Sequence, residues 1–479
     1  MTEVFRPASL PRKVTHPAGV PIRTKNPDTK RESAIFSYDL IKDRRYTEDR
    51  YAFHIPVNIY PEADAYGALS VNKRVQEIVR ENPGMYVLGI NRGERNLISI
   101  AVTAPDGTIV EQRNLNVFDN FDYRRKLAER EKERTEDRRN WTTVKEIKNI
   151  KAGYLTRVVG EIVRLVKKYG CVIAMERLDM DFKTGRQAFE KNVYEQFERD
   201  LVSRLSFLAD KNEADRFGTV LQLANPGKTE IERTKFPQNG ILFLVNPAHV
   251  SKTDPLTGFV NRLNLHFGKL ADAETIIDNF DGFRFNGKTG RFVLSFHYDK
   301  AAPGKEAGDG QKVWNVETYG ERIEQERVEN APADTFTDKV TVLTTAMKEL
   351  LDCAGITWND GEDLLGRLKG QGTDFYKSFF GLLRLTMRCT SWDNATREFR
   401  IIGCTANASG QFYDSRRAPE RLPKDGDTLA AWNIARKAHI VLRNIRNFKP
   451  GATTDENGKK AKGPRTVVSD AEWFAEIQK

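Results

Sequence analysis

The sequence predicts a mixed α/β fold, and three observations support this prediction. Apolar residues recur at helical spacing between residues 147 and 166, so this segment predicts a long amphipathic helix. Residues 171–175 are apolar and predict a strand directly after that helix. Before the helix, two further short apolar segments, residues 86–90 and 97–102, predict strands, and a third strand is predicted at residues 109–114.

The predicted order of elements narrows the fold class. A Pro-Asp-Gly turn signal separates the second and third strands, which indicates a meander, and Gly170 marks the end of the helix. Three strands, a helix and a fourth strand in this order are typical of the ribonuclease H-like fold. Asn91 ends the first strand and Glu176 ends the fourth. These strands are neighbours in that fold, so their ends can share metal ions.

Three longer segments resemble the three RuvC segments of the type V-A CRISPR effectors, which are RNA-guided DNA endonucleases. The segments are GINRGERNL at 89–97, AMERLDMDFKTGR at 174–186 and LPKDGDTLAAWNIARK at 422–437. The likeness also includes GYLTRVV, KNVYEQFE, SKTDPLTGFVN and FYDSR, and it extends from about residue 5 to about residue 447. A member of that family is normally more than twice as long, so the chain resembles the C-terminal half of an effector.

The resemblance implies an order of domains. A basic β-unit that resembles the last part of the wedge domain, which grips the guide-RNA handle, is expected first, and an α/β nuclease lobe is expected as an insert in the RuvC sequence. The expected boundaries are 1–84 for the wedge-like unit, 85–120 for RuvC segment I, 121–168 for the bridge helix and the following helix, 169–205 for RuvC segment II, 206–421 for the insert, 422–447 for RuvC segment III, and 448–479 for a linker and terminal helix. Within the insert we expect a strand at 241–245 and helices around 338–354 and 374–387.

The resemblance also assigns catalytic positions. A RuvC site holds two Mg²⁺ or Mn²⁺ ions between acidic side chains, and Asn91, Glu176 and Asp427 match its metal-binding positions, while Arg388 matches an arginine that helps to place the scissile strand. The family has aspartate where this chain has Asn91. An amide offers one neutral oxygen, and its nitrogen is a donor that cannot bridge a second ion. We therefore expect weakened metal binding and impaired DNA cleavage. Arg177 beside Glu176, and Thr-Leu-Ala at 428–430, also depart from the family pattern.

Further positions match other functions of these effectors. Cleavage of a guide-RNA precursor without metal requires a base and cations that stabilise charge on phosphate. The resemblance assigns this role to His16, Lys25 and Lys42. It assigns the lid of the cleavage site to Phe182, Lys183 and Arg186, and the anchor of the bridge helix to Trp141.

Composition favours an anionic partner. The chain of 479 residues has 77 Lys and Arg against 67 Asp and Glu, a formal net charge of +10, and residues 1–55 have 11 Lys and Arg against 7 Asp and Glu. Guide RNA and target DNA are the expected partners, with a second polypeptide supplying the recognition lobe. Four distant cysteines indicate neither a disulfide framework nor a zinc site. No membrane-spanning segment or signal peptide is evident, so a cytoplasmic protein is expected, encoded by a prokaryote or a phage and acting in antiviral defence.

Three functions remain open from the sequence. The first is an RNA-guided DNA endonuclease, or its catalytic half, impaired at Asn91. The second is a nuclease-dead subunit or repressor that holds RNA and DNA. The third keeps ribonuclease activity alone, at the three processing residues.

Overall fold

The computed structural model describes ten ranges of the chain: residues 14–15, 58–59, 68–93, 96–140, 147–177, 191–208, 237–302, 312–328, 336–451 and 463–478. The chain divides into two compact units, residues 1–70 and 71–479. In the first unit, β1 (Val14–Thr15) pairs antiparallel with β2 (Asn58–Ile59). Seven residues to which the resemblance assigns a role lie outside the described residues. They are the RNA-processing residues His16, Lys25 and Lys42, the lid residues Phe182, Lys183 and Arg186, and the bridge-helix anchor Trp141.

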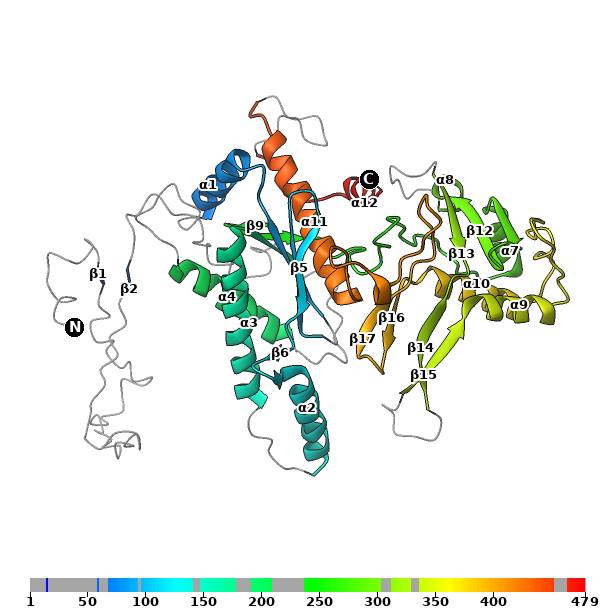
Figure 1. Cartoon of the computed structure of the whole chain (residues 1–479), viewed down its shortest axis with the longest axis horizontal. Coiled ribbons are helices and arrows are strands. Elements are labelled where there is room, and N and C mark those ends of the chain that lie inside the picture. The colour runs from blue at the N-terminus through cyan, green and yellow to red at the C-terminus, as the bar shows by residue number, and fades with distance from the viewer. Residues whose placement is uncertain are drawn as a thin grey trace, which may run out of the picture. The chain divides into compact units, whose positions relative to one another are not determined.

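The second unit contains a six-stranded mixed sheet, in the order β5-β4-β3-β8-β10-β9 (Figure 1). The predicted meander is confirmed, because β3 and β4 pair antiparallel and β4 pairs antiparallel with β5. The predicted fourth strand, β8, pairs parallel with β3. The bounds are β3 Val87–Arg92, β4 Ile98–Thr103, β5 Ile109–Asn114, β8 Val172–Glu176, β9 Gln238–Asn239 and β10 Leu242–Val245. This sheet confirms the mixed α/β, ribonuclease H-like fold class.

Strand β10 lies in this sheet, although the sequence placed residues 241–245 in the nuclease-lobe insert. It pairs parallel with β8, from Leu242 opposite Ile173 to Val245 opposite Glu176. A parallel strand buried on both faces is a continuous apolar run without alternation, and a run of this kind does not reveal its partner. The pairing extends the sheet on the side of β8.

Four helices accompany the sheet: α1 (Ala68–Glu81), α3 (Ile147–Tyr169), α4 (Lys191–Leu208) and α11 (Gly426–Asn447). The predicted long helix is confirmed as α3, and it ends at Gly170, which has a φ of +57°. Glycine adopts this left-handed conformation without a Cβ clash. Helix α11 packs along β3, β4 and β8 (Figure 1). Before α3, the short strands β6 (Val117–Phe118) and β7 (Phe121–Asp122) precede α2 (Tyr123–Asn140).

A second hydrophobic core lies in the segment between the sheet and α11. It is rich in aromatic residues, including Phe283, Phe292, Phe296 and Phe379. Its elements are α7 (Leu270–Asp278), β11 (Gly282–Asn286), β12 (Arg291–His297), α8 (Tyr298–Ala301), β13 (Val313–Glu317), β14 (Glu321–Arg327), β15 (Phe336–Val342), α9 (Leu343–Cys353), α10 (Thr373–Met387), β16 (Thr390–Asp393), β17 (Glu398–Ile401) and the short 3₁₀ helix η2 (Ser415–Arg417). The helix expected at 374–387 is confirmed as α10.

The helix expected around 338–354 begins later than predicted. Residues 336–342 form β15, which pairs along its whole length with β14, and α9 starts at Leu343. Val340, Thr341 and Val342 are β-branched and favour the extended conformation. A short helix, α12 (Asp470–Ile477), follows α11 and packs against it. None of the described helices is long and apolar enough to cross a membrane.

Candidate functional site

The C-terminal ends of β3 and β8 lie at one edge of the sheet. Their parallel register pairs Ile90 with Met175. Asn91 and Glu176 each come one residue later: Asn91 is the last residue but one of β3, and Glu176 is the last residue of β8. The residues before them are buried and apolar apart from the glycine in β3, which fixes both strands inside the sheet. Asn91 is itself buried, with 6% of its surface exposed. The structure thus brings the first two predicted site residues to the same edge.

The third predicted residue, Asp427, comes from the first turn of α11. Asp425 caps this helix: its carboxylate accepts hydrogen bonds from the backbone N–H groups of Asp427 and Thr428. In return, the Thr428 hydroxyl accepts from the backbone N–H of Asp425, which completes a capping box. Because the cap fixes where the helix starts, it places Asp427 next to Asn91, although the two are 336 residues apart in sequence.

Both carboxylate oxygens of Asp427 accept hydrogen bonds from side-chain amides. Asn91 Nδ2 donates to Oδ1 at 3.3 Å, and Asn96 Nδ2 donates to Oδ2 at 2.5 Å. Burial raises the pKa of Asp427 to about 7, and the charge of Asp425 adds to the rise, while the two amides act in the opposite direction. The carboxylate is therefore held by neutral donors in an environment that penalises its charge.

Arg92 lies beside the second acid of the site. Its guanidinium NH2 group donates to the backbone carbonyl of Glu176, and its Nε atom is 3.9 Å from the Glu176 carboxylate. Glu198 of α4 lies on the same guanidinium, 4.0 Å from NH1. Burial raises the pKa of Glu176, and the charge of Arg92 opposes that rise. The positive charge of Arg92 is thus placed among the acids of this edge.

Several residues that support the site were not assigned a role from the sequence. The Asn96 side chain is oriented by Arg124 of α2, whose NH1 donates to Asn96 Oδ1 at 2.5 Å, and by Asn116, whose Nδ2 donates to the same oxygen at 3.0 Å. Tyr194 of α4 donates its hydroxyl to the Gly93 carbonyl at 2.8 Å and fixes the turn after β3. Asn96 lies within the GINRGERNL segment, so the motif match could have predicted that Asn96 belongs to the site. Arg124 lies in a mixed-charge helix that gave no such signal.

The fourth predicted catalytic residue, Arg388, belongs to a different set of contacts. It caps the C-terminal end of α10, and its NH2 group donates to the Ile323 carbonyl of β14 at 2.9 Å. Its nearest carboxylate is Glu324, at 3.8 Å. These contacts of Arg388 join α10 to β14, and they do not include Asn91, Glu176 or Asp427.

The comparison with known families agrees with this geometry. A family model described as the RuvC nuclease domain matches residues 65–479. The chain belongs to this family. A RuvC nuclease domain therefore covers the sheet, α11 and the aromatic core between them, and the coarser prediction of a nuclease fold is confirmed.

RuvC nucleases generally use divalent metal ions, so the donor set of this chain can be tested against that requirement. Mg²⁺ requires charged oxygen ligands in near-octahedral geometry. Here Asn91 directs its amide N–H toward Asp427, and Arg92 directs its charge toward Glu176. No group of three or more Asp, Glu, His or Cys side chains in the described ranges is arranged to hold one metal ion. The described residues of this edge, as they are arranged, do not fit a two-metal site.

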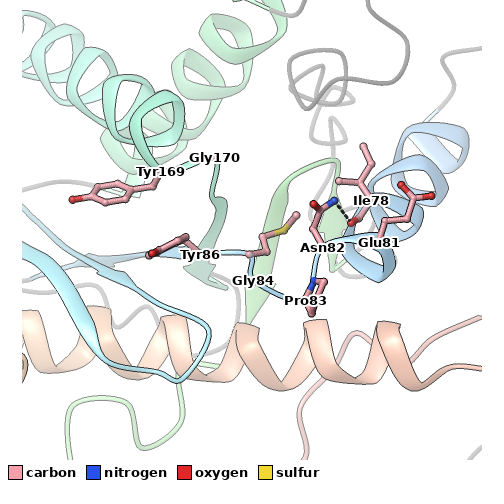
Figure 2. A pocket seen from close by; sticks show the side chains of 9 residues that line it. Ile78, Glu81, Asn82, Pro83, Gly84, Tyr86, Tyr169 and Gly170 are labelled. Carbon is pink, nitrogen blue, oxygen red and sulfur yellow. Dashed lines mark hydrogen bonds between the residues drawn. The ribbon is translucent and has the colours of Figure 1, made fainter.

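The opposite edge of the sheet contains a cavity that is separate from this site. It has a volume of ≈ 470 Å³ and lies before the start of β3 and β8, where Tyr86 and Tyr169 are among the residues that line it (Figure 2). The end of α1 forms the other wall, from Ile78 to Asn82. Because Asn91 and Glu176 are at the far ends of the same two strands, this cavity does not contribute to the candidate site.

Proposed function

We propose that this protein is an RNA-guided DNA-binding protein of the CRISPR type V-A kind, whose RuvC domain holds nucleic acid without cutting it. Guide RNA and target DNA are its partners, and a second polypeptide supplies the recognition lobe. The proposal retains metal-independent processing of guide RNA at His16, Lys25 and Lys42. It rests on the family, on the motif resemblance and on one observation at the site.

That observation is the hydrogen bond from Asn91 to Asp427. An acidic pair at these positions repels itself and requires a cation between the two carboxylates. With asparagine at position 91, the Asn91 amide donates a hydrogen bond and the Asp427 carboxylate accepts it, so the two side chains interact favourably without a cation. Asparagine at position 91 therefore removes one negative charge from the metal ligands. It also removes the repulsion between two carboxylates that a bound metal ion would relieve.

An impaired endonuclease is the second candidate. It is favoured by the retention of Glu176 and Asp427 on the elements that the resemblance assigns to them, with β3, β8 and α11 meeting at one edge. The two candidates differ in one measurable property, since an endonuclease makes product when Mg²⁺ is added and a binding protein does not.

The test combines binding and cleavage with the full chain. A labelled RNA that carries the guide handle should bind, with affinity falling at least about tenfold between 50 and 200 mM salt, because phosphate contacts release counterions. A complementary single-stranded DNA should then be retained and recovered intact in Mg²⁺ as in EDTA.

The matched control for this experiment is Glu176→Ala. If Mg²⁺ yields DNA product and Glu176→Ala abolishes it, the protein is an endonuclease and the proposal is wrong. RNA binding that does not change with salt would contradict the proposed contact with phosphate.

A further inference from the structure

A second cavity, in the aromatic core region, combines a stacked aromatic pair with arginines. It has a volume of ≈ 580 Å³, within the range of about 300–1,000 Å³ typical of small-molecule sites. Tyr319 and Phe412 line it, with ring centroids 4.1 Å apart and planes 13° from parallel. Both rings are only partly buried. Because each ring covers one face of the other, the flat apolar platform at this accessible cavity is an outer face of the stacked pair.

Arginine side chains surround this platform. The Arg291 guanidinium lies 4.8 Å from the centre of the Tyr319 ring and 5.1 Å from that of Phe412. Arg291 is also paired with Glu317 at 3.2 Å, which fixes its position. The exposed Arg417 lines the same cavity, and its side chain makes no hydrogen bond or ion pair with the described residues. Arg417 thus offers a positive charge for a ligand.

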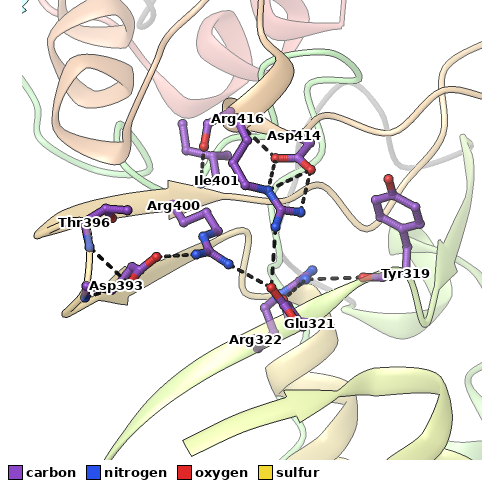
Figure 3. Close-up of polar contacts among 11 residues, drawn as sticks. Tyr319, Glu321, Arg322, Asp393, Thr396, Arg400, Ile401, Asp414 and Arg416 are labelled. Atoms are coloured by element: carbon purple, nitrogen blue, oxygen red, sulfur yellow. Dashed lines mark hydrogen bonds and ion pairs between the residues drawn. The ribbon is translucent and has the colours of Figure 1, made fainter. Parts of the chain in front are cut away.

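Asp414 interacts electrostatically with Arg417, but its side-chain ion pair is with Arg416. The nearest acid in the cavity wall, Asp414, accepts hydrogen bonds from Arg416 Nε and NH2 at 2.9 and 2.7 Å. Figure 3 shows Arg416 held between this carboxylate and Glu321, to which its NH1 is 3.6 Å distant. Arg291 and Arg417 line the cavity against the single acid Asp414, so the cavity lining keeps an excess of positive charge.

The walls of the cavity are held by hydrogen bonds, so the platform is built before a ligand arrives. Asn407 Oδ1 accepts from the backbone N–H groups of Ser409 and Gln411, which fixes the turn before Phe412. The hydroxyl of Tyr413 donates to the Pro423 carbonyl and closes the segment behind it. A preformed site loses less conformational entropy when it binds its ligand.

We propose that this cavity binds one unpaired nucleotide of a single-stranded nucleic acid. The base stacks on the platform of Tyr319 and Phe412, and the phosphate is held by Arg417. Aromatic rings beside a positive charge are the combination by which proteins bind single strands with little sequence preference. The net charge of +10 favours the same anionic ligand. The inference rests on the proposed nucleic-acid-binding function, and it adds the place and the form of one contact.

The test uses the full chain and four variants. Phe412→Leu removes the stacking surface but keeps an apolar side chain, and Phe412→Trp restores an aromatic ring. Arg417→Ala removes the phosphate contact, and Arg421→Ala is its control, an exposed arginine four residues further that does not line the cavity. The probes are an eight-nucleotide single-stranded DNA, the RNA of the same sequence and an abasic oligomer of the same length, measured by fluorescence anisotropy.

We expect Phe412→Leu to weaken binding of the base-bearing strands by about 5- to 100-fold, the range for the loss of one stacked base. Phe412→Trp should retain the affinity, and its added indole fluorescence should be quenched by the base-bearing strands and not by the abasic oligomer. Arg417→Ala should weaken the binding of both base-bearing strands and reduce the salt dependence of their affinity. Arg421→Ala should bind them as the unchanged chain does. The DNA and RNA arms identify which strand the site prefers.

Two results would overturn the inference. One is equal binding by Phe412→Leu and the unchanged chain, with thermal unfolding the same for both. The other is an added indole fluorescence in Phe412→Trp that is not quenched when a base-bearing strand is bound. If the chain binds the guide-handle RNA and neither short oligomer, this inference fails while the proposed function stands.

Discussion

At the scale of single residues, the site depends on what Asn91 supplies to Asp427. A carboxylate at position 91 would place two like charges at a buried edge and would require a cation. The amide donates a hydrogen bond instead, and Asn96 donates a second one to the other oxygen. The pKa of Asp427 still rises to about 7, because burial and the charge of Asp425 outweigh the two amides.

The raised pKa predicts a stability that falls as the pH rises. The folded state holds the Asp427 proton more tightly than the unfolded chain, whose pKa is 3.8, so this contribution is complete below pH 3.8 and is lost as the pH rises through about 7. Asp427→Asn should remove that loss, which we expect to be on the order of a few kcal/mol. The measurement is urea unfolding between pH 5 and 8 in EDTA.

Asp106→Asn is the control for the pH experiment. Asp106 is exposed, and hydrogen bonds from Thr108 lower the pKa of its carboxyl group, so this variant should keep the pH dependence of the unchanged chain between pH 5 and 8. An unfolding free energy that falls equally with pH in the chain and in Asp427→Asn would show that Asp427 is ionised throughout this range.

At the scale of elements, the site depends on how closely α11 crosses β3. Gly89 makes this approach possible, because a Cβ atom at this position would lie 2.0 Å from the Ala431 carbonyl oxygen and 2.9 Å from the Ala435 nitrogen. Both contacts are with backbone, which cannot move aside cheaply. The glycine in the middle of the strand thus lets the first turn of α11 bring Asp427 to the edge.

Gly89→Ala should therefore destabilise the fold by about 1–3 kcal/mol or more, the range for overpacking of a core. Gly160→Ala is the matched control: this glycine is in α3 with nothing within 4 Å of the added methyl group, and alanine there should stabilise the helix by about 0.5–1 kcal/mol. Chemical unfolding of the two variants measures both effects. Equal stability of Gly89→Ala and the unchanged chain would mean that α11 does not need this close approach.

The sequence predicted the elements better than their partners. Apolar runs and the Gly170 stop identified the meander, α3 and β8, because these signals are local. The assignment of residues 241–245 to the insert failed to anticipate their pairing with β8, since strand pairing depends on the tertiary fold. The role of Arg92 was missed for the same reason, because its contact with Glu198 joins β3 to α4 across a long sequence separation.

At the scale of the whole RuvC domain, α11 belongs to two hydrophobic cores. Ile434, Ala435 and Ala438 pack in the core of the sheet, while Leu429 and Trp432 pack in the aromatic core. The candidate site is at the start of this shared helix, and the cavity of Phe412 lies in the segment that leads to it. The scaffold that positions a nuclease site is thus retained, and we propose that Asn91 removes the need for metal at that site.

Calorimetric titration of Mn²⁺ tests that claim most directly, because it measures metal binding without guide, partner or cleavage. We predict no saturable heat for the unchanged chain, and saturable binding for Asn91→Asp, since the restored carboxylate repels Asp427 and requires a cation. Asn91→Asp combined with Glu176→Ala should bind more weakly than Asn91→Asp alone, which would locate the ion at this edge. If the unchanged chain binds Mn²⁺ as tightly as Asn91→Asp, and Glu176→Ala abolishes that binding, then Asn91 serves as a metal ligand and the site still requires metal.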